Sequence, residues 1–460
     1  MTAADRHRVV IAGGGVAAVE TLLALRHLAG EQVSVELLAP ERAFVHRPSS
    51  VGTPFGFGAP APLDLRELAG RFGAGLNRGA VSVVEPEHRT VVAAPSGEAI
   101  FYDLLVVAVG AVPRPAIAGA LTFAGPQDAP ALEGLLDAVA RGEFRRLAFT
   151  LPAGATWSLP VYELAVMASV DLRNRGVSDA EITVVTPEPE PLRIFGAAAG
   201  AAIRDMLAAR GVELVTGARP LAARDGRLML QGAEPLAADA VVALPALSGP
   251  HLYGLPADGD GYLPVDAHGR VAGVAGVYAA GDATTFPIKQ GGLATQQADA
   301  VAEAIAEDLG VRHGAAPFRP VLRGLLLTGG APLYLRAELS EPAEAATART
   351  LRGVASGRAL WWPPGKVAGR YLAPYLADAR PVDLAAETLV DRVANRSAPA
   401  PDHDDGFELA LLLAEEDAKL GDYRHALHAL NAAAALYGGV LPATWAQNRS
   451  RWQRELARTG

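Results

Sequence analysis

Short apolar runs separated by amphipathic stretches dominate the first part of the chain. Residues 9–12 and 33–38 are almost continuously apolar, which is typical of strands buried on both faces of a parallel sheet. A helical pattern begins between them at Val16, directly after three glycines. The order strand, helix, strand predicts a unit in which the two strands lie parallel and the helix crosses between them.

Two different patterns follow this first unit. Residues 41–65 are rich in proline and glycine and show few helix or strand signals, so we expect a loop that lines a site or is disordered. Residues 81–102 have the pattern of short strands with turns at Pro86 and at 95–97, which predicts a meander. Residues 104–109 are again apolar, and we expect another buried strand there.

The alternation of strand and helix patterns restarts near residue 121. Its first turn differs from the glycine turn at the start of the chain, because Trp157 and Pro160 stand where close backbone approach to a pyrophosphate needs glycine. We therefore expect the same kind of fold with an obstructed nucleotide site, and Glu188 or Glu190 after the next strand does little to restore it. The expected strands are 145–152, 181–191 and 212–217, and the expected helices are 158–176 and 195–211.

Residues 240–310 are expected to return to the first domain. A strand at 274–280 is followed by Gly281 and Asp282, and a helix opens near Gly291. The sheet of the first domain is thus predicted to take strands from both sides of the second domain in the sequence.

The predicted fold class is α/β, with two Rossmann-like domains, a C-terminal interface region and a short helical tail. Residues 320–339 have the pattern of a hairpin, and residues 396–406 have the composition of a linker. The tail resembles up to one copy of a tetratricopeptide repeat, which cannot bury its own apolar face, so we expect it to dock on the body, a second subunit or a partner. The expected divisions are residues 1–120 and 246–318 for the first domain, 121–245 for the second, 319–395 for the interface region and 407–460 for the tail.

Length and composition restrict the class of protein. The chain has 460 residues, of which 50% are hydrophobic and 20% charged, as expected for a globular protein of two or three domains. The formal net charge is −9 and no basic stripe is present, which argues against a nucleic-acid partner. There is no run of about 18 strongly apolar residues to span a bilayer. The glycine turn lies too near the start for a targeting extension, so the cytoplasm is the expected location.

The absence of cysteine excludes several chemistries at once. Disulfides, thiolate metal sites, cysteine nucleophiles and covalent flavin attachment through sulfur all require a residue that this sequence lacks. The histidines show no metal-ligand spacing, so no metal site is expected. Redox chemistry is therefore left to a bound cofactor.

The glycine turn after the first strand is a dinucleotide fingerprint. It reads Gly13-x-Gly15-x-x-Ala18, in which the first glycine permits the tight turn, the second lets backbone approach a pyrophosphate, and the small third residue lets helix pack on strand. The helix N-terminus then offers its N–H groups and positive dipole end to the phosphates. The usual ribose-binding acid belongs at the end of the second strand, and Glu41 just beyond that strand is the candidate.

The chain resembles the FAD-dependent pyridine nucleotide–disulfide oxidoreductase superfamily in three ordered motifs, GGGVAAVE, YDLLVVAVGAVP and VYAAGDAT. The resemblance covers about residues 8–390. Within the superfamily the chain looks most like the sulfide:quinone oxidoreductase and flavocytochrome c sulfide dehydrogenase branch, with the type II NADH dehydrogenases somewhat further away. The cue is Val161-Tyr162-Glu163 after the obstructed turn, together with PIKQGGLATQQAD after the Gly-Asp pair.

This resemblance implies a non-covalently bound FAD, with NAD(P)H as a less favoured cofactor. Gly13, Gly15 and Ala18 would hold the pyrophosphate, and Glu41 the adenosine ribose. Asp282 matches the acid that accepts a hydrogen bond from the ribityl chain, and the helix that follows would point its N-terminus at the flavin pyrimidine ring. The full expected set of cofactor-contacting residues is Gly13, Gly15, Val16, Ala17, Ala18, Glu41, Arg42, Arg47, Pro48, Gly110, Gly281, Asp282, Lys289, Gly291, Gly292 and Leu293.

Three residues are candidates for the chemistry, each with a plainer alternative. Glu163 lies where the resemblance brings the chain near the flavin, so burial would raise its pKa and suit it to proton transfer; an exposed helical glutamate is the equal alternative. Lys289 would neutralise a reduced flavin or bind an anionic substrate, although most lysines are simply solvated. His46 lies in the loop expected near the flavin and titrates near neutral pH, although a single loop histidine is more often incidental.

The aromatic-rich segment at residues 361–376, near the end of the part of the chain that resembles the superfamily, admits two interpretations. Relatives dock on membranes through amphipathic helices in this region, and the face shared by this segment suits a membrane interface. Core packing over the first domain explains the same face, and we favour it because only Lys366 and Arg370 flank the segment with positive charge. The aromatic and apolar residues concerned are Trp361, Trp362, Val367, Tyr371, Leu372, Tyr375 and Leu376.

The resulting prediction is an FAD-dependent oxidoreductase that passes electrons to a quinone-like or other small acceptor. Sulfide oxidation by the route of the relatives is excluded, because that route needs cysteines. Two alternatives stay open: an NAD(P)H dehydrogenase like the type II enzymes, and a flavin-bearing redox-sensing module that recruits a protein through its tail. The expected partners are a small-molecule donor and acceptor, and a homodimer and peripheral membrane contact are left open.

Overall fold

The apolar runs near the N-terminus become neighbouring strands of one parallel sheet. The computed structural model describes residues 6–57, 62–339, 350–379 and 443–459, together with single helical residues at 414, 418, 423, 426, 427 and 430. The strand order is β20-β9-β1-β2-β5, and every pair is parallel. These strands are β1 (His7–Ala12), β2 (Val33–Ala39), β5 (Gly75–Arg78), β9 (Leu104–Val107) and β20 (Val277–Ala279).

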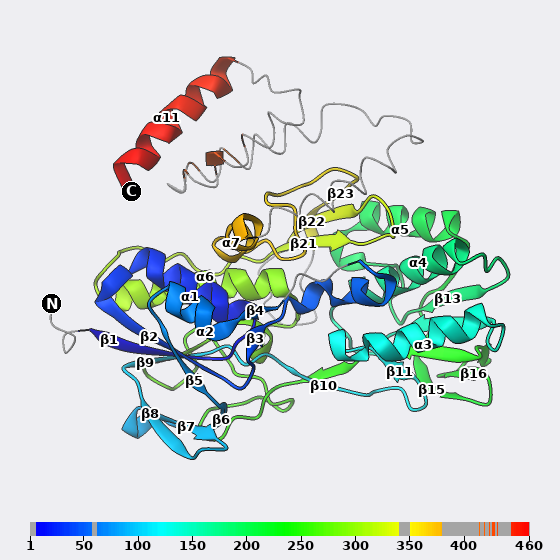
Figure 1. Ribbon diagram of the computed structural model, residues 1–460, viewed down its shortest axis with the longest axis horizontal. Coiled ribbons are helices and arrows are strands. Elements are labelled where there is room, and N and C mark those ends of the chain that lie inside the picture. The colour runs from blue at the N-terminus through cyan, green and yellow to red at the C-terminus, as the bar shows by residue number, and fades with distance from the viewer. Residues whose placement is uncertain are drawn as a thin grey trace.

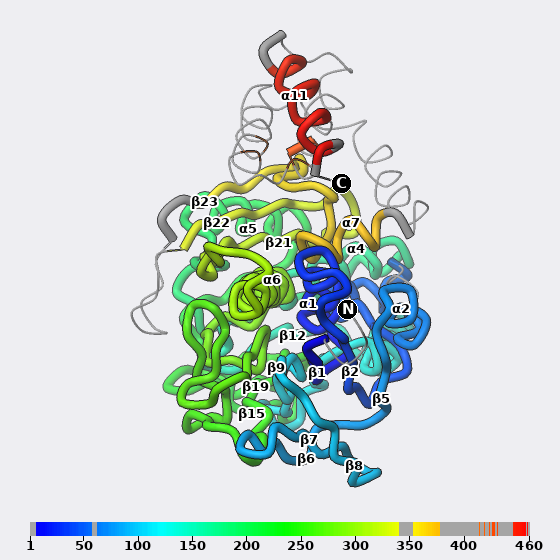
Figure 2. Tube along the Cα trace, turned by 90° about the vertical axis from the view of Figure 1, so that its left-hand side faces the viewer, coloured from blue at the N-terminus to red at the C-terminus, as the bar shows by residue number. Residues whose placement is uncertain are grey.

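Two long helices lie side by side on one face of this first sheet. α1 (Val16–Leu28) follows β1, α6 (Gly291–Asp308) follows β20, and the two helices pack closely together (Figures 1 and 2). Small residues make this approach possible, because Ala18 and Ala298 are both fully buried in the core between helices and sheet. The shorter helix α2 (Leu65–Arg71) contacts β5.

An antiparallel meander covers the other face of the first sheet, as expected for residues 81–102. Val91 and Ile100 of the meander share a core with Val10 and Leu105 of the parallel sheet. Both faces of the parallel strands are therefore buried, which explains why these strands are apolar throughout. The meander consists of β6 (Ala80–Glu85), β7 (Thr90–Ala94) and β8 (Glu98–Phe101), in that order.

A second parallel sheet has the order β11-β18-β12-β13-β14. Its core includes the fully buried Phe149 and Val184, and it packs against helices on one face and a small antiparallel sheet on the other (Figure 1). The strands are β11 (Leu121–Thr122), β12 (Arg146–Thr150), β13 (Glu181–Val185), β14 (Val212–Val215) and β18 (Ala240–Ala243). The helices are α3 (Ala129–Ala140), α4 (Leu159–Asn174) and α5 (Ala197–Ala209), and the small sheet is β15 (Pro220–Arg224), β16 (Arg227–Leu230) and β17 (Leu236–Ala237).

The chain crosses between the two parallel sheets through a pair of adjacent strands. β10 (Val112–Arg114) leads toward the second sheet, β19 (Ala246–Ser248) leads back, and the two strands pair antiparallel (Figure 1). The expected return of the chain to the first sheet is therefore observed.

The protein has two halves, one built on the first parallel sheet and one on the second, and a further antiparallel sheet joins them. The hairpin expected at 320–339 is present as β21 (Val321–Leu326) and β22 (Leu333–Leu339), and β23 (Thr350–Ser356) pairs with it. This sheet contacts α4 and α5 of the second half and α6 of the first half, as Figure 2 shows from the side. Helix α7 (Leu372–Ala379) then packs against α1.

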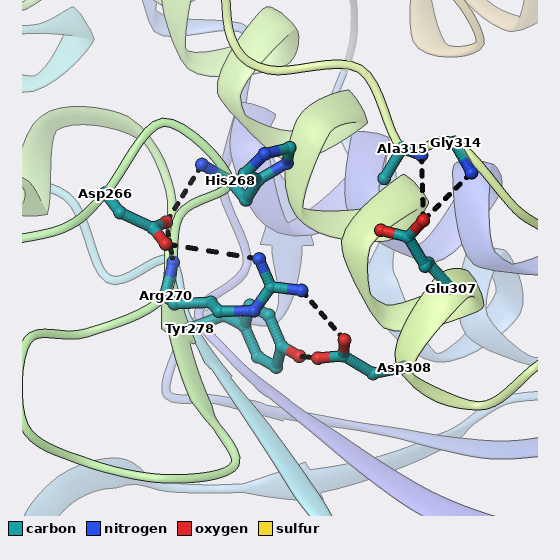
Figure 3. A network of polar contacts seen from close by, with 8 residues as sticks. All are labelled: Asp266, His268, Arg270, Tyr278, Glu307, Asp308, Gly314 and Ala315. Atoms are coloured by element: carbon teal, nitrogen blue, oxygen red, sulfur yellow. Dashed lines mark hydrogen bonds and ion pairs between the residues drawn. The ribbon is translucent and has the colours of Figure 1, made fainter.

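Polar contacts fix the C-terminal end of α6, which is the end opposite the glycine turn (Figure 3). Arg270 donates to Asp308 at 2.8 Å, and the hydroxyl of Tyr278 donates to the other oxygen of the same carboxylate. Asp266 accepts the backbone N–H of Arg270 at 2.8 Å and that of His268 at 2.9 Å. This network ties the C-terminal turn of α6 to the loop that precedes β20, so it fixes the helix from the end opposite the candidate site.

The loop expected at 41–65 is more ordered than its composition indicates. It contains the 3₁₀ helix η3 (Arg47–Phe55), and β3 (Ala43–Phe44) pairs with β4 (Leu63–Asp64). Pro48 in the first turn favours the helical start, and Ser50 donates to the carbonyl of Arg47 at 2.7 Å. The other 3₁₀ turns are η2 (Gly30–Gln32), η4 (Pro86–His88), η5 (Pro126–Asp128), η6 (Arg193–Phe195) and η7 (Gly281–Ala283).

The aromatic-rich segment packs on the first half of the protein, as we favoured. Leu372 is fully buried in the core of α1 and α6, and Tyr371, Tyr375 and Leu376 pack against that core. Trp361 is buried against Tyr334, whereas Trp362 is 42% exposed. Among the described residues, no helix is long and apolar enough to cross a membrane.

The described part of the tail contains α11 (Ala443–Thr459) and single residues of the preceding stretch. Trp452 is buried against Ala426 and Leu430, so these side chains form a small core of their own. The linker expected at 396–406 lies outside the described residues. So do Gly421 and Asp422, in the part of the tail that resembles a tetratricopeptide repeat.

Candidate functional site

The first turn of the site requires glycine for a steric reason. Gly13 has φ +134°, and a methyl group added there would lie 2.2 Å from the carbonyl oxygen of Ala108 at the end of β9. Its N–H donates to the carbonyl of Leu38 at 2.8 Å. The turn is therefore held tightly against two neighbouring strands, and no side chain fits there.

The second glycine of the fingerprint faces open space. Gly15 is the N-cap of α1, and among the described residues no atom lies within 4 Å of a methyl group added there. No described side chain caps the helix at this end. The first N–H groups of α1 and its positive dipole end are thus left for a ligand, and an anion such as a pyrophosphate fits this arrangement. The third position, Ala18, is fully buried against the sheet, as the fingerprint requires.

Glu41 lies beside this turn. Its carboxylate oxygen is 3.3 Å from the position of a methyl group on Gly14, and the side chain is exposed. Arg42 and Arg47 are exposed as well. Glu41 therefore stands next to the glycine turn, although β2 itself ends at Ala39 without an acidic residue.

Asp282 reaches the same edge of the first sheet from β20. The residues that end β1, β9 and β20 are in register, so their carboxyl ends meet at one edge. Gly281 lies between α1 and α6, where a methyl group would be 3.1 Å from Ala17 and 3.2 Å from Ala294. Burial raises the pKa of the Asp282 carboxyl, and the charges of Lys289 and Arg47 oppose that shift.

The N-terminus of α6 is where several distant segments converge. Gln290 caps the helix, because its side-chain oxygen accepts the N–H of Leu293 at 2.8 Å. A methyl group on Gly291 would lie 3.1 Å from Pro48 of η3 and 3.1 Å from Val367. The loop after β2, the start of α6 and the segment before α7 therefore meet at one point.

Lys289 is committed to its own loop. Its ammonium donates to the carbonyls of Thr284 and Phe286, the latter at 2.7 Å, and lies 3.8 Å from the centre of the Tyr262 ring. The side chain is buried, and burial lowers the pKa of Lys289 to about 8. These contacts favour a role in shaping the loop before α6 over direct action on a substrate.

His46 and Gly110 occupy different surroundings. The imidazole of His46 is buried, lies 2.8 Å from the hydroxyl of Ser49 through Nδ1 and contacts the ring of Phe44, at the start of η3. Gly110 has φ +78°, and in the described structure no atom lies within 4 Å of a methyl group added there. Gly110 thus borders open space near the carboxyl end of β9, whereas His46 stabilises the local turn.

Glu163 is buried, so the alternative of an exposed helical glutamate does not hold. Its Oε1 accepts the backbone N–H of Leu327 at 2.7 Å and an ion-paired hydrogen bond from Lys366. Among the described residues its Oε2 has no hydrogen-bond partner although it is buried. Burial raises the pKa of the Glu163 carboxyl, and Lys366 opposes that shift. A carboxyl group in this setting can exchange a proton with a neighbouring ligand.

Lys366 is a site residue that sequence reasoning missed. We considered it only as a charge flanking the aromatic segment, yet its side chain is 7% exposed and paired with Glu163 across the structure. Val367, the next residue, touches the N-terminus of α6. The Glu163–Lys366 pair therefore lies close to the point where η3, α6 and the C-terminal segment meet. A lysine in an aromatic, glycine-containing loop carries no local signal of this pairing.

At the second, glycine-poor turn the nearby polar groups are paired with side chains of the same half. Glu188 accepts hydrogen bonds from Ser158 at 2.9 Å, from Tyr162 at 2.7 Å and from Thr186 at 3.1 Å. Burial raises the pKa of the Glu188 carboxyl, and its hydroxyl partners oppose that shift. Trp157 packs edge-on against Phe195 at 5.8 Å between ring centres. Glu188, the acid that follows β13, therefore points toward its own half and is hydrogen-bonded there.

Comparison with known proteins finds a family model that matches part of the chain. The sequence profile of the pyridine nucleotide-disulphide oxidoreductase family matches residues 162–305, which include the Glu188 region and the start of α6. The match covers less than a third of the 460-residue chain, and in that part it supports the resemblance to the pyridine nucleotide–disulfide oxidoreductases. A search among curated proteins by sequence finds no match.

Solved structures of oxidoreductases have a fold similar to that of this chain. The sulfide:quinone oxidoreductase of Aquifex aeolicus matches with a TM-score of 0.70 and 20% identity, over 86% of this chain and 93% of that one. The ferredoxin reductase of the CYP199A2 system from Rhodopseudomonas palustris matches with a TM-score of 0.58 and 18% identity, over 76% and 91%. NDH2 from Plasmodium falciparum in complex with NADH matches with a TM-score of 0.51 and 15% identity, over 61% and 64%. The resemblance to the sulfide:quinone oxidoreductase branch is confirmed as a likeness of fold.

In the described ranges, histidine, aspartate and glutamate side chains nowhere gather in a group of three that could hold a metal ion.

Proposed function

We propose that this oxidoreductase passes electrons through a non-covalently bound FAD to a quinone-like or other small acceptor, without cysteine chemistry. When bound, FAD takes up and releases electrons in pairs. The chain has no cysteine to carry them further, so the acceptor must meet the cofactor directly. The observation that carries the proposal is the buried Glu163–Lys366 pair beside the N-terminus of α6.

The proposed cofactor position follows the edge of the first sheet. Gly13, Gly15 and the N-terminus of α1 would bind the pyrophosphate, because the turn is open there and its N–H groups are uncapped among the described residues. Glu41 would accept hydrogen bonds from the adenosine ribose, and Asp282 from the ribityl chain. The N-terminus of α6 would face the pyrimidine ring, where its dipole stabilises negative charge.

In this proposal Glu163 holds the proton that the acceptor needs. A quinone-like acceptor takes up two electrons and two protons; one proton would arrive with the electron pair as a hydride equivalent, and the other needs a donor within hydrogen-bond reach of a quinone oxygen. The free Oε2 of Glu163 is the atom we assign to this transfer, while Oε1 stays fixed by Leu327 and Lys366. Lys366 stabilises the carboxylate that remains after the proton has left. Lys289 acts only through the loop that it shapes.

The second half of the protein supports a donor other than NAD(P)H. In a Rossmann half, the acid after the second strand binds the nucleotide ribose. Here Glu188 already binds Ser158, Tyr162 and Thr186, and Trp157 occupies the turn. A nicotinamide dinucleotide would have to displace these contacts, so we propose that it is not the physiological donor.

Anaerobic reduction of the purified yellow protein tests the proposal. We expect NADH and NADPH to leave the flavin absorbance unchanged, dithionite to bleach it, and a soluble quinone to restore it. Rapid bleaching by either nicotinamide would contradict our account of the second half. If a soluble quinone failed to re-oxidise the reduced flavin of the wild-type protein, the proposed acceptor would be contradicted.

Glu163→Gln tests the proton donor. We expect quinone reduction to slow by about 10²- to 10⁴-fold with the flavin retained, since amide nitrogen cannot supply the proton. In the wild type the rate should fall as pH rises through the raised pKa of Glu163, because the donor is then ionised. Glu98→Gln, on the exposed strand β8, is the matched control and should leave the rate unchanged.

A further inference from the structure

Acidic side chains are buried where α1 and α6 pack together. Glu20 of α1 is fully buried, and Glu303 of α6 is 8% exposed. Asp299 of α6 is half-buried and interacts electrostatically with both, and one of its oxygens, Oδ1, is buried with no hydrogen-bond partner among the described residues. Charged groups in a helix–helix core are costly, so each of them needs a compensating partner.

Glu20 finds its partners in the segment that precedes α7. Its two carboxylate oxygens accept the backbone N–H groups of Tyr371 at 2.8 Å and Leu372 at 2.7 Å. A methyl group on Gly369 would lie 2.5 Å from Oε2 of Glu20, so the backbone approaches as closely as glycine permits. Glu20 thus caps the start of α7 from another helix, a charge-assisted contact.

Besides burial, the charge of Glu20 and a hydrogen bond to its carboxyl group are among the causes that raise the pKa of Asp299, so the two carboxyl groups are neighbours. An ionised carboxylate has no proton to donate, so two carboxyl groups form such a bond only when one of them is protonated. Burial raises the pKa of Asp299 well above its ordinary value, and the neighbouring charges of Glu20 and Glu303 raise it further.

The surrounding charges do not remove the need for this proton. Arg370 donates to Glu303 at 3.1 Å and is the cation that opposes the rise in the pKa of Asp299. Among the described residues facing the pair, the carboxyl groups of Glu20, Asp299 and Glu303 outnumber this one guanidinium. On the outer side, the ring of His27 contacts Tyr371 at 5.2 Å between ring centres.

The segment that Glu20 binds also carries Lys366. Lys366 donates a hydrogen bond to Glu163, and the next residue, Val367, lies beside the N-terminus of α6. A few residues later, the backbone of residues 369–372 lies against the carboxylate of Glu20. The contacts with Glu20 therefore fix the end of the segment whose other end supplies the partner of the proposed proton donor.

We propose that Glu20 and Asp299 share one proton and act as a positioning pair, clamping residues 369–372 onto α1 and α6 so that Lys366 stays against Glu163. The catalytic consequence rests on the proposed function, whereas the clamp itself does not. As pH rises through the folded-state pKa of Asp299, the shared proton is lost and two carboxylates face each other. The stability supplied by the pair is thus complete at acidic pH and lost on the alkaline side.

Thermal unfolding of the FAD-loaded protein across about pH 5 to pH 9 tests the shared proton. In Asp299→Asn the amide donates to Glu20 without a titratable proton, so the fall in Tm at alkaline pH should shrink relative to the wild type. Asp205→Asn, an exposed aspartate on α5, should retain the wild-type fall. An equal fall in all three proteins would overturn the proposal, as would a uniform loss of Tm in Asp299→Asn with the pH dependence unchanged.

Tryptic cleavage after Lys366 and Arg370 tests the clamp without depending on that variant. We expect the wild-type cleavage rate, corrected for the activity of trypsin on an unfolded substrate, to rise with pH. Glu20→Gln should raise it about tenfold or more at neutral pH, because one carbonyl oxygen cannot hold both N–H groups. Cleavage that is insensitive to pH and to Glu20→Gln would overturn the clamp.

A third readout separates this proposal from the proposed function. In Glu20→Gln we expect quinone reduction to fall with flavin content unchanged, and its pH profile to shift because Lys366 no longer holds Glu163. Absence of quinone reduction in the wild type would remove the catalytic consequence only, since the Tm and cleavage results do not involve an acceptor. A Glu20→Gln enzyme with the wild-type rate and pH profile would overturn the positioning role.

Discussion

The two parallel sheets present the same strand–turn–helix at their carboxyl edges, yet the turns differ in what fills them. At the first turn, Gly15 faces open space and Glu41 is exposed beside it. At the second turn, Glu188 is half-buried and accepts hydrogen bonds from Ser158 and Tyr162. One half keeps its polar groups available for a ligand, and the other satisfies them internally. In our proposal the second half keeps the backbone topology of a nucleotide-binding fold, while its own side chains pair the polar groups that a nucleotide would bind.

The largest expected effect comes from a methyl group at the first turn. Gly13→Ala forces a side chain onto the carbonyl of Ala108 at a φ that disfavours any L residue, so we expect the loss of bound flavin and several kcal/mol of stability, on the order of 3 or more. Flavin absorbance and thermal unfolding measure this. Gly154→Ala at the second turn should cost only about 1–2 kcal/mol, because its φ is +87° but no described atom lies within 4 Å. Equal effects at the two turns would break the comparison.

A smaller effect is expected inside the filled turn. Tyr162→Phe removes one donor to the half-buried Glu188, which should destabilise the protein by about 1–3 kcal/mol without loss of flavin. Burial raises the pKa of Glu188, so its contribution to stability is complete at acidic pH and declines as pH rises; losing a donor raises that pKa further and deepens the decline. Chemical denaturation at several pH values checks this. A variant that lost its flavin instead would place the cofactor in the wrong half.

The smallest expected effect on the fold is at the open turn. Glu41→Gln should leave the stability of the flavin-free protein within about 0.5 kcal/mol, because the side chain is exposed. FAD affinity should fall by about tenfold, since a charge-assisted hydrogen bond to ribose becomes a neutral one. Titration of the flavin-free protein with FAD measures both. Unchanged affinity would remove Glu41 from the cofactor site.

Regular features of the fold could be predicted from local patterns. The apolar runs predicted the strands of both parallel sheets, and the glycine spacing predicted the tight turn that Gly13 makes. Bulky residues predicted the obstructed second turn, although the inward position of Glu188 depends on partners that no periodicity marks. The helical turn η3 was not expected, because its order comes from capping and from packing on other segments rather than from hydrophobic spacing.

The chemistry of the site depended on pairs that are distant in sequence. Lys366 lies 203 residues from Glu163, and the N–H of Tyr371 lies 351 residues from the carboxylate of Glu20. Such contacts follow from how complete elements pack, so a local pattern cannot indicate them. Glu163 was a candidate through family resemblance, but its burial and its cation became visible only in the structure.

Nucleotide binding to each half tests the central claim most directly. We would determine the crystal structure of the protein with FAD and NADPH both present in excess. The account predicts FAD along the edge that carries Gly15 and Glu41, and Glu188 still bound to Ser158 and Tyr162 with no nucleotide at the second turn. NADPH seated against Trp157 with Glu188 turned toward its ribose, or a first turn left empty beside excess FAD, would contradict it.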